Sequence, residues 1–239
     1  MKILKVIFAL LLIYSLQACN KGTLWGIHGK GNNISETRNN GTFNKVEVRC
    51  DADVDIISDS TFNIDVSAQE NILRVLDTKI EGTTLIIEFN KRVRWHSKIK
   101  IIIHLKDLNA IILSGSGNIN AQNNLAANDL ELNISGSGNI SVPSVTVQNL
   151  NGNISGSGNI NISGGTITSA KFSVSGSGNI NASEELSTTV KAKISGSGNI
   201  SINVFESLTA GISGSGHIKY KGTPVINSTI SGSGSLIHI

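Results

Sequence analysis

One phrase recurs seven times between Leu113 and Ile239: an apolar residue, then Ser-Gly-Ser-Gly, and in most copies Asn-Ile. Successive copies are spaced 21, 20, 20, 20, 18 and 18 residues apart; their first serines are Ser114, Ser135, Ser155, Ser175, Ser195, Ser213 and Ser231. A fixed period of this length is typical of a solenoid, in which each repeat packs on the one before it. The repeat therefore constrains the chain to a stack of similar coils.

Apolar and polar residues alternate on both sides of each phrase. Leu130, Leu132 and Ile134 precede one corner, and Ile140 and Val142 follow it. Alternation with period two is typical of a strand with one face turned inward. The two glycines are expected to supply the backbone angles of a sharp corner. Each repeat is therefore predicted to be strand, corner, strand.

These features predict an all-β chain whose residues 113–239 form a parallel β-helix with about 20 residues per coil. The period is too short for a propeller blade, and neither helical repeats nor the leucine-rich scaffold fits the pattern. In a β-helix, equivalent residues of successive coils lie about 4.8 Å apart. Stacked amides can hydrogen-bond one another, so we expect a side-chain ladder. It would contain Asn118, Asn139, Asn159, Asn179 and Asn199, followed by His217 and Ser235.

Residues 42–112 also contain strand patterns but lack the glycine corners. They are expected to form either irregular early coils or a β cap, because an open solenoid end would expose strand edges and core. A short helical turn is expected within residues 69–77. Cys50, between strand-forming valines, is interpreted as a small packed side chain.

The N-terminus carries the pattern of a secretory signal over residues 1–18. Lys2 and Lys5 accompany an apolar run that is too short to span a bilayer. Leu16-Gln17-Ala18-Cys19 then matches a bacterial lipobox, which predicts lipidation of Cys19. Residues 19–41 are interpreted as the lipidated cysteine and a flexible tether. We expect a bacterial envelope protein held at the outer membrane by lipid, on its periplasmic or its exposed side.

Charge and acid placement argue against several function classes. Without the two lysines of the leader, 18 basic residues face 17 acidic ones, so no global field favours nucleic acid. The repeats hold few acids, and no two share one position of successive coils; they are Asp129, Glu131, Glu184, Glu185 and Glu206. Glu184 and Glu185 are expected in a loop. The histidines show no paired ligand spacing, so neither a metal site nor a cofactor is expected.

Two charged segments precede the repeats. Asp51, Asp53 and Asp55 alternate along one strand, which indicates a solvated face or, alternatively, a weak calcium site. Basic residues then alternate with mainly apolar ones, which predicts one strand with a basic face; they are Arg92, Arg94, His96, Lys98 and Lys100. Such a face either keeps an edge soluble or docks an anionic glycan, a lipid phosphate or an acidic partner.

The segment from Lys100 to Leu108, leading into Leu113-Ser114-Gly115-Ser116-Gly117, resembles the opening of the repeats in the head GIN domain family. The resemblance extends over residues 42–239. It implies a right-handed parallel β-helix and a role in adhesion at the bacterial surface, with no catalytic residues to carry over. We therefore expect a non-catalytic envelope lipoprotein that binds glycans or proteins. The alternative is a carbohydrate-active β-helix enzyme with its site in residues 42–113.

Overall fold

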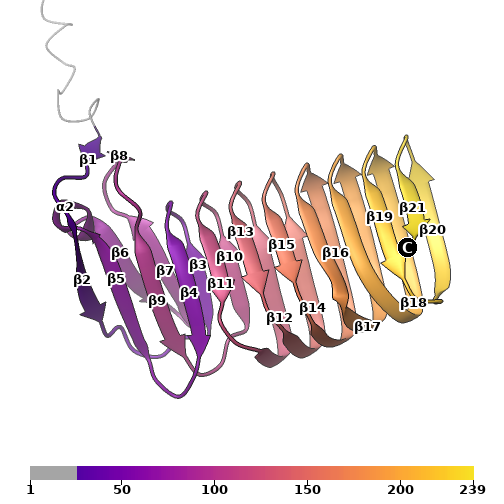
Figure 1. Ribbon diagram of the computed structural model, residues 1–239, viewed down its shortest axis with the longest axis horizontal. Helices are drawn as coiled ribbons and strands as arrows, with labels where there is room; N and C mark the ends of the chain where they lie inside the picture. Colours follow the sequence, from indigo (N-terminus) through magenta and orange to yellow (C-terminus); the bar gives the residue numbers. More distant parts are fainter. Residues whose placement is uncertain (1–25) are drawn as a thin grey trace, which may run out of the picture.

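The computed structural model describes residues 26–239. They form a stack of coils, each coil being one turn of the solenoid (Figure 1). Each coil contributes to two ladders of parallel strands, and β17 and β18 are long enough to join both. The first ladder runs β7 (Thr84–Phe89), β3 (Lys45–Val48), β10 (Ala110–Leu113), β12 (Leu125–Ile134), β14 (Val145–Ile154), β16 (Gly165–Gly176), β17 (Asn179–Gly196), β18 (Asn199–Gly214) and β20 (Val225–Ser231). The second runs β9 (Lys100–Leu105), β4 (Asp53–Ser58), β11 (Asn118–Ala121), β13 (Asn139–Val142), β15 (Asn159–Ile162), β17, β18, β19 (His217–Lys221) and β21 (Ser235–His238). The expected parallel β-helix is confirmed.

The repeat residues take the register that the sequence predicts. Asn139 pairs with Asn118 on one side and with Asn159 on the other, and Ile140 follows the same pattern one residue later. The isoleucines that close the corners are fully or almost fully buried up to Ile218. They stack into an apolar column inside the coil, where the hydrophobic effect stabilises every rung in the same way.

The corner glycines are required mainly because successive coils lie so close together. Gly176 has a φ of 146°, which favours glycine as expected, but Gly158 has no positive φ. A Cβ atom on Gly158 would lie 2.1 Å from the carbonyl oxygen of Gly138 in the preceding coil. The expectation that both glycines serve backbone angles is therefore wrong for the second position. It is also wrong for the first position in the first three copies, where Gly115, Gly136 and Gly156 have no positive φ and a Cβ atom would clash with backbone atoms.

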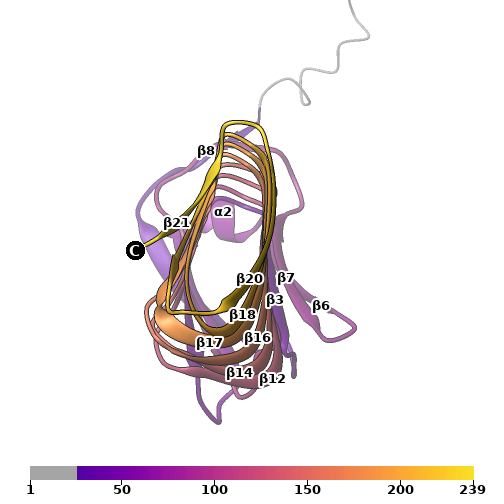
Figure 2. The ribbon, with the colours of Figure 1, turned by 90° about the vertical axis from the view of Figure 1, so that its right-hand side faces the viewer.

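Residues 42–112 provide both early coils and a cap. The coil of β3 and β4 lies between the coil of β7 and β9 and the coil of β10 and β11, so the first two coils stack in an order that differs from the sequence. β5 (Asn63–Gln69) pairs antiparallel with β9, and β6 (Leu76–Glu81) pairs antiparallel with β7. The helical turn α2 (Glu70–Leu73), expected within residues 69–77, buries Ile72 and Leu73. Figure 2 shows α2 across the far end of the coil interior.

Part of the expected tether is ordered. β1 (Ile27–His28) pairs with β8 (Val93–Trp95), and β2 (Asn33–Arg38) pairs antiparallel with β5. Most side chains of β2 are exposed, so the strand is held by its backbone and lacks the apolar alternation that would predict it. The tether is thus wrong for these residues. The predicted signal peptide of residues 1–18 and the predicted lipidation site at Cys19 lie outside the described residues.

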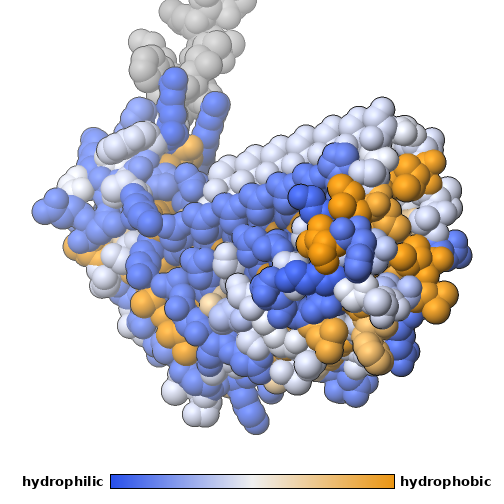
Figure 3. Space-filling view, turned by 45° about the vertical axis from the view of Figure 1, so that its right-hand side comes forward, coloured by the Kyte–Doolittle hydropathy of each residue, from blue (hydrophilic) through white to orange (hydrophobic). Residues whose placement is uncertain are grey.

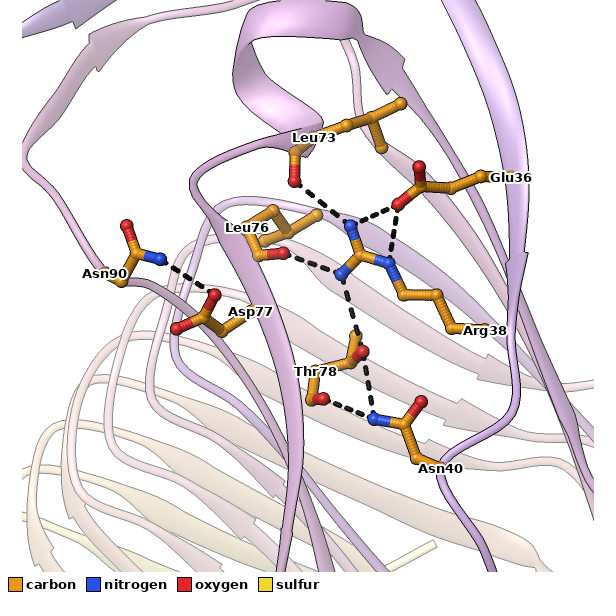
Figure 4. Close-up of polar contacts among 8 residues, drawn as sticks. All are labelled: Glu36, Arg38, Asn40, Leu73, Leu76, Asp77, Thr78 and Asn90. Atoms are coloured by element: carbon orange, nitrogen blue, oxygen red, sulfur yellow. Dashed lines mark hydrogen bonds and ion pairs between the residues drawn. The ribbon is translucent and has the colours of Figure 1, made fainter.

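Arg38 joins β2 to the chain that leaves α2 (Figure 4). Its guanidinium donates to the backbone carbonyl oxygens of Leu73, at 3.1 Å, and Leu76, at 2.6 Å. It also pairs with Glu36 at 2.5 Å and reaches Thr78 Oγ1 at 3.4 Å. With only 17% of the side chain exposed, these bonds form where water competes weakly. Arg38 therefore fastens the cap to its outermost strand.

Candidate functional site

The basic segment of residues 92–100 is not one strand. β8 ends at Trp95 and β9 begins at Lys100, with an irregular stretch between them. Among residues 26–239, β8 pairs only with β1, whereas β9 lies between β4 and β5, so the two strands belong to different sheets. Trp95, one of the apolar residues that alternate with the basic ones, is 59% exposed. The prediction of a continuous strand is therefore wrong.

Lys98 and Lys100 form ion pairs with acidic residues of β4. Lys98 Nζ pairs with Asp53, and Lys100 Nζ lies 3.4 Å from the carboxylate of Asp55. The hydrogen bond that Lys98 donates to Asp53 raises the pKa of Lys98. Burial acts most strongly on Asp53 and opposes its charge, but bonds from Lys98 and Asn118 outweigh it and lower the pKa of Asp53. The two charged segments are thus counter-ions, so Asp53 and Asp55 are paired carboxylates rather than the solvated face considered above, whereas Asp51 is exposed.

The other basic residues have separate roles. His96 Nδ1 lies 2.7 Å from the backbone oxygen of Ser97, and its ring packs against Phe89 at 5.6 Å between centroids. Arg92 and Arg94 are exposed, and neither forms an ion pair within residues 26–239. Together with Trp95 they leave an aromatic and basic edge on β8, which stands at the end of the coil beside β1 (Figure 1).

The predicted asparagine ladder is present as a chain of hydrogen bonds. Asn139 Nδ2 donates to Asn118 Oδ1 at 2.8 Å, and each following amide donates to the one before it. The first amide of the ladder contacts a charged side chain, because Asn118 donates a hydrogen bond to Asp53 at 2.8 Å. Figure 3 shows a hydrophilic band beneath the pale ridge of serine and glycine corners. Each amide uses one N–H within the ladder, and its second N–H is not part of the ladder.

Two acids of the repeats share a hollow that the sequence reasoning missed. Asp129 and Glu131 lie on the outer face of β12, in a hollow of about 460 Å³. Asn149 donates to Asp129 at 2.8 Å, and Asn133 donates to Glu131 at 2.6 Å. Their spacing of two residues on one strand was the available signal, because alternate residues share a face. A comparison of equivalent positions in successive coils does not detect this pair of acids, because both lie on one strand.

Glu185 is buried inside the coil rather than placed in a loop. It lies within β17 with relative exposure of 0%, and its described partner is the hydroxyl of Ser187, 3.1 Å from both carboxylate oxygens. Burial raises the pKa of Glu185 to about 8, partly offset by that hydrogen bond. The sequence reasoning missed the site because strand pairing is irregular here, with a register shift between Ala182 and Ser187.

The described residues hold no cluster of three or more His, Cys, Asp or Glu side chains suited to a metal ion. Within residues 26–239 no helix is long and apolar enough to cross a membrane. Cys50 is buried, as expected for a packed side chain, and burial raises the pKa of its thiol to about 12.

Known proteins with the same architecture are similar to this chain. The family model described as "Putative auto-transporter adhesin, head GIN domain" matches residues 42–224. A crystal structure described as a putative adhesin from Bacteroides fragilis is 29% identical, with a TM-score of 0.85, and the match covers 90% of this chain and 100% of that one. One described as a putative lipid binding protein from Parabacteroides distasonis is 29% identical, with a TM-score of 0.76 and the same coverage. A structure described as a putative adhesin from Parabacteroides merdae is 24% identical, with a TM-score of 0.74 over 90% of this chain and 99% of that one, and shares the fold. No curated protein matches the chain.

Proposed function

The chain belongs to the head GIN domain family, and we propose that it is a non-catalytic adhesin of the bacterial envelope that binds glycans. The observation that carries the proposal is the asparagine ladder. Its amides offer spare donors at intervals of about 4.8 Å along the second ladder of strands. A repetitive row of neutral donors suits repetitive hydroxyl groups, which makes a glycan the favoured ligand over a titratable substrate.

A glycan array with two matched variants tests this proposal. Asn159 and Asn161 lie two residues apart on β15, but the side-chain bonds of the ladder pass through Asn159. We expect Asn159→Ser to weaken glycan binding by several-fold, because it interrupts the row of donors, while Asn161→Ser binds like the wild type. Thermal melts check that both variants fold. Equal binding by both variants and the wild type would contradict the proposal.

We further propose that Cys19 is lipidated and that the edge of β8 rests on the anchoring membrane. Ile27, in β1, is eight residues from Cys19, so the chain between them spans at most about 29 Å. β8 pairs with β1 and therefore stays within reach of the anchor. Arg92 and Arg94 suit lipid phosphates, and an exposed tryptophan such as Trp95 suits the membrane interface.

Vesicles and cell fractions test the anchor and the edge separately. Cys19→Ala should move the protein from the detergent phase to the aqueous phase, and unchanged partitioning would rule out the lipid. Arg92→Glu with Arg94→Glu should weaken binding of the unlipidated domain to vesicles containing anionic phospholipid, and more so at low salt. Lys98→Gln serves as the control, since it removes one charge from a residue already paired with Asp53. Equal binding by the Arg92/Arg94 double variant and by Lys98→Gln would exclude docking through β8.

A further inference from the structure

A hollow of about 310 Å³ on the first ladder of strands gathers three lysines. Lys171 lies on β16, and Lys191 and Lys193 lie on β17. The hollow continues over β18 and β20, where residues are small; its remaining lining is Phe172, Ser173, Ala192, Thr209, Ala210, Gly211 and Thr229. A Cβ atom on Gly211 would meet only the side chain of Lys193, at 3.9 Å, so the space beside the lysines is open.

The three lysines gather positive charge on one face, and Lys171 also lines the neighbouring hollow of Asp129 and Glu131. Lys171 pairs in register with Lys191, so their Cα atoms lie about 4.8 Å apart, and Lys193 follows on the same face about 7 Å along the strand. None of the three forms an ion pair within residues 26–239, in contrast to Lys98 and Lys100. Like charges directly opposite one another on neighbouring strands are unfavourable. An anion bound between them would remove that repulsion.

We propose that this hollow, the lysine hollow, binds a phosphorylated saccharide. A phosphate monoester carries nearly two negative charges and presents three oxygens, so one group can bond to both Lys171 and Lys191. The hollow is lined mainly by apolar atoms, which suits the C–H face of a sugar ring. Ser173, Thr209 and Thr229 also line the hollow, and their hydroxyls suit the ring hydroxyls. The inference rests on the proposed function, since it names the charge that an adhesive glycan would carry.

Isothermal titration calorimetry on the full domain tests the site with glucose 6-phosphate, glucose and inorganic phosphate. We expect glucose 6-phosphate to bind at least ten-fold more tightly than inorganic phosphate, and glucose to give no measurable heat. Lys171→Gln with Lys191→Gln should weaken glucose 6-phosphate binding at least ten-fold. The control is Lys219→Gln, an exposed lysine of β19 on the second ladder, which should bind like the wild type.

Three outcomes would overturn the lysine hollow: no binding of glucose 6-phosphate, equal binding of inorganic phosphate, or binding that the double variant retains. All three lysines are exposed, so the double variant should fold, and a thermal melt verifies it. The asparagine ladder lies on the other ladder of strands. The glycan-array result of Asn159→Ser is therefore independent of the lysine hollow, and the two proposals fail separately.

Discussion

At the corner of each coil, the next coil can stack closely because glycine carries a hydrogen atom where other residues carry a Cβ atom. Gly158 is the sharpest case, because a Cβ atom there would lie 2.1 Å from one backbone oxygen and 2.8 Å from Ile134 Cγ2. Backbone atoms of the coil below cannot move without disturbing their own ladder. The repeated glycines therefore set the spacing of the stack, and the serines between them fill the exposed positions.

Gly158→Ala should lower the free energy of unfolding by about 1–3 kcal/mol, because overpacking forces the backbone apart. Gly164→Ala is the matched control. A Cβ atom on Gly164 would lie 3.6 Å from its nearest neighbour, an ordinary contact, so its effect should stay within about 0.5 kcal/mol. Urea unfolding of both variants measures the difference. Similar destabilisation by the two changes would show that close stacking is not the cause.

Glu185 should make stability depend on pH. Its pKa is raised to about 8 in the folded chain, whereas the unfolded carboxyl titrates near 4.3. Folding therefore takes up a proton between these values, and stability falls as pH rises from about 4.3 to about 8, by a few kcal/mol in all. Glu185→Gln should remove this dependence. The variant's melting temperature should rise relative to the wild type between pH 5 and pH 8.

Glu184→Gln is the control for that experiment. Lys221 lowers the pKa of the exposed Glu184, so its contribution to stability is lost only in acid. The wild type and Glu184→Gln should therefore show the same slope of melting temperature between pH 5 and pH 8. A wild-type melting temperature that is flat over this range would show that Glu185 is not titrating as its burial implies.

Among the elements of the cap, β2 depends on few side chains. β2 contributes little apolar area, yet Arg38 bonds to two backbone carbonyl oxygens beyond α2. Arg38→Met should lower the free energy of unfolding by about 1–3 kcal/mol, because carbonyl groups lose their donor in a place with little water. Arg74→Met should change it by no more than about 0.5 kcal/mol, since Arg74 is 74% exposed in its pair with Glu70. Thermal melts compare the two, and equal effects would contradict this role of Arg38.

The sequence predicts strand register where identical residues recur at a fixed period. It does not predict the contacts of segments that contain no repeated motif. The columns through Asn118 and Ile119 follow from the repeat, because a fixed period gives a fixed register. The insertion of the β3–β4 coil between β7–β9 and β10–β11 has no such signal, since residues 42–112 contain no repeated corner. The pairing of Lys98 with Asp53 was hidden for the same reason: only the fold brings these residues together. The lysine hollow likewise depends on the register between β16 and β17, which places Lys171 beside Lys191. The repeat period predicts this register, but the charges of the lysines do not.

Over the whole molecule, contacts run almost entirely between neighbouring coils. β13 pairs with β11 and β15, and β15 pairs with β13 and β17. Stability in such a stack is close to a sum of coil terms and nearest-neighbour terms. The cap differs, because β5 and β6 join α2 to both β9 and β7. We therefore expect the cap and its adjoining coil to open as one unit, separately from the central coils.

Hydrogen exchange on two core variants tests this division. Ile72→Ala, in α2, and Ile160→Ala, in β15, each truncate a fully buried isoleucine and should cost about 2–5 kcal/mol. Ile72→Ala should speed exchange in β2, β5, β6, β7 and β9 while β15 to β19 stay protected, because no contact carries the loss across the intervening coils. Ile160→Ala should speed exchange in β13, β15 and the first part of β17 while the cap stays protected. If either variant instead raised exchange evenly from β2 to β21, the stack would be a single cooperative unit, and adhesion force applied at one end would have to unfold all of it at once.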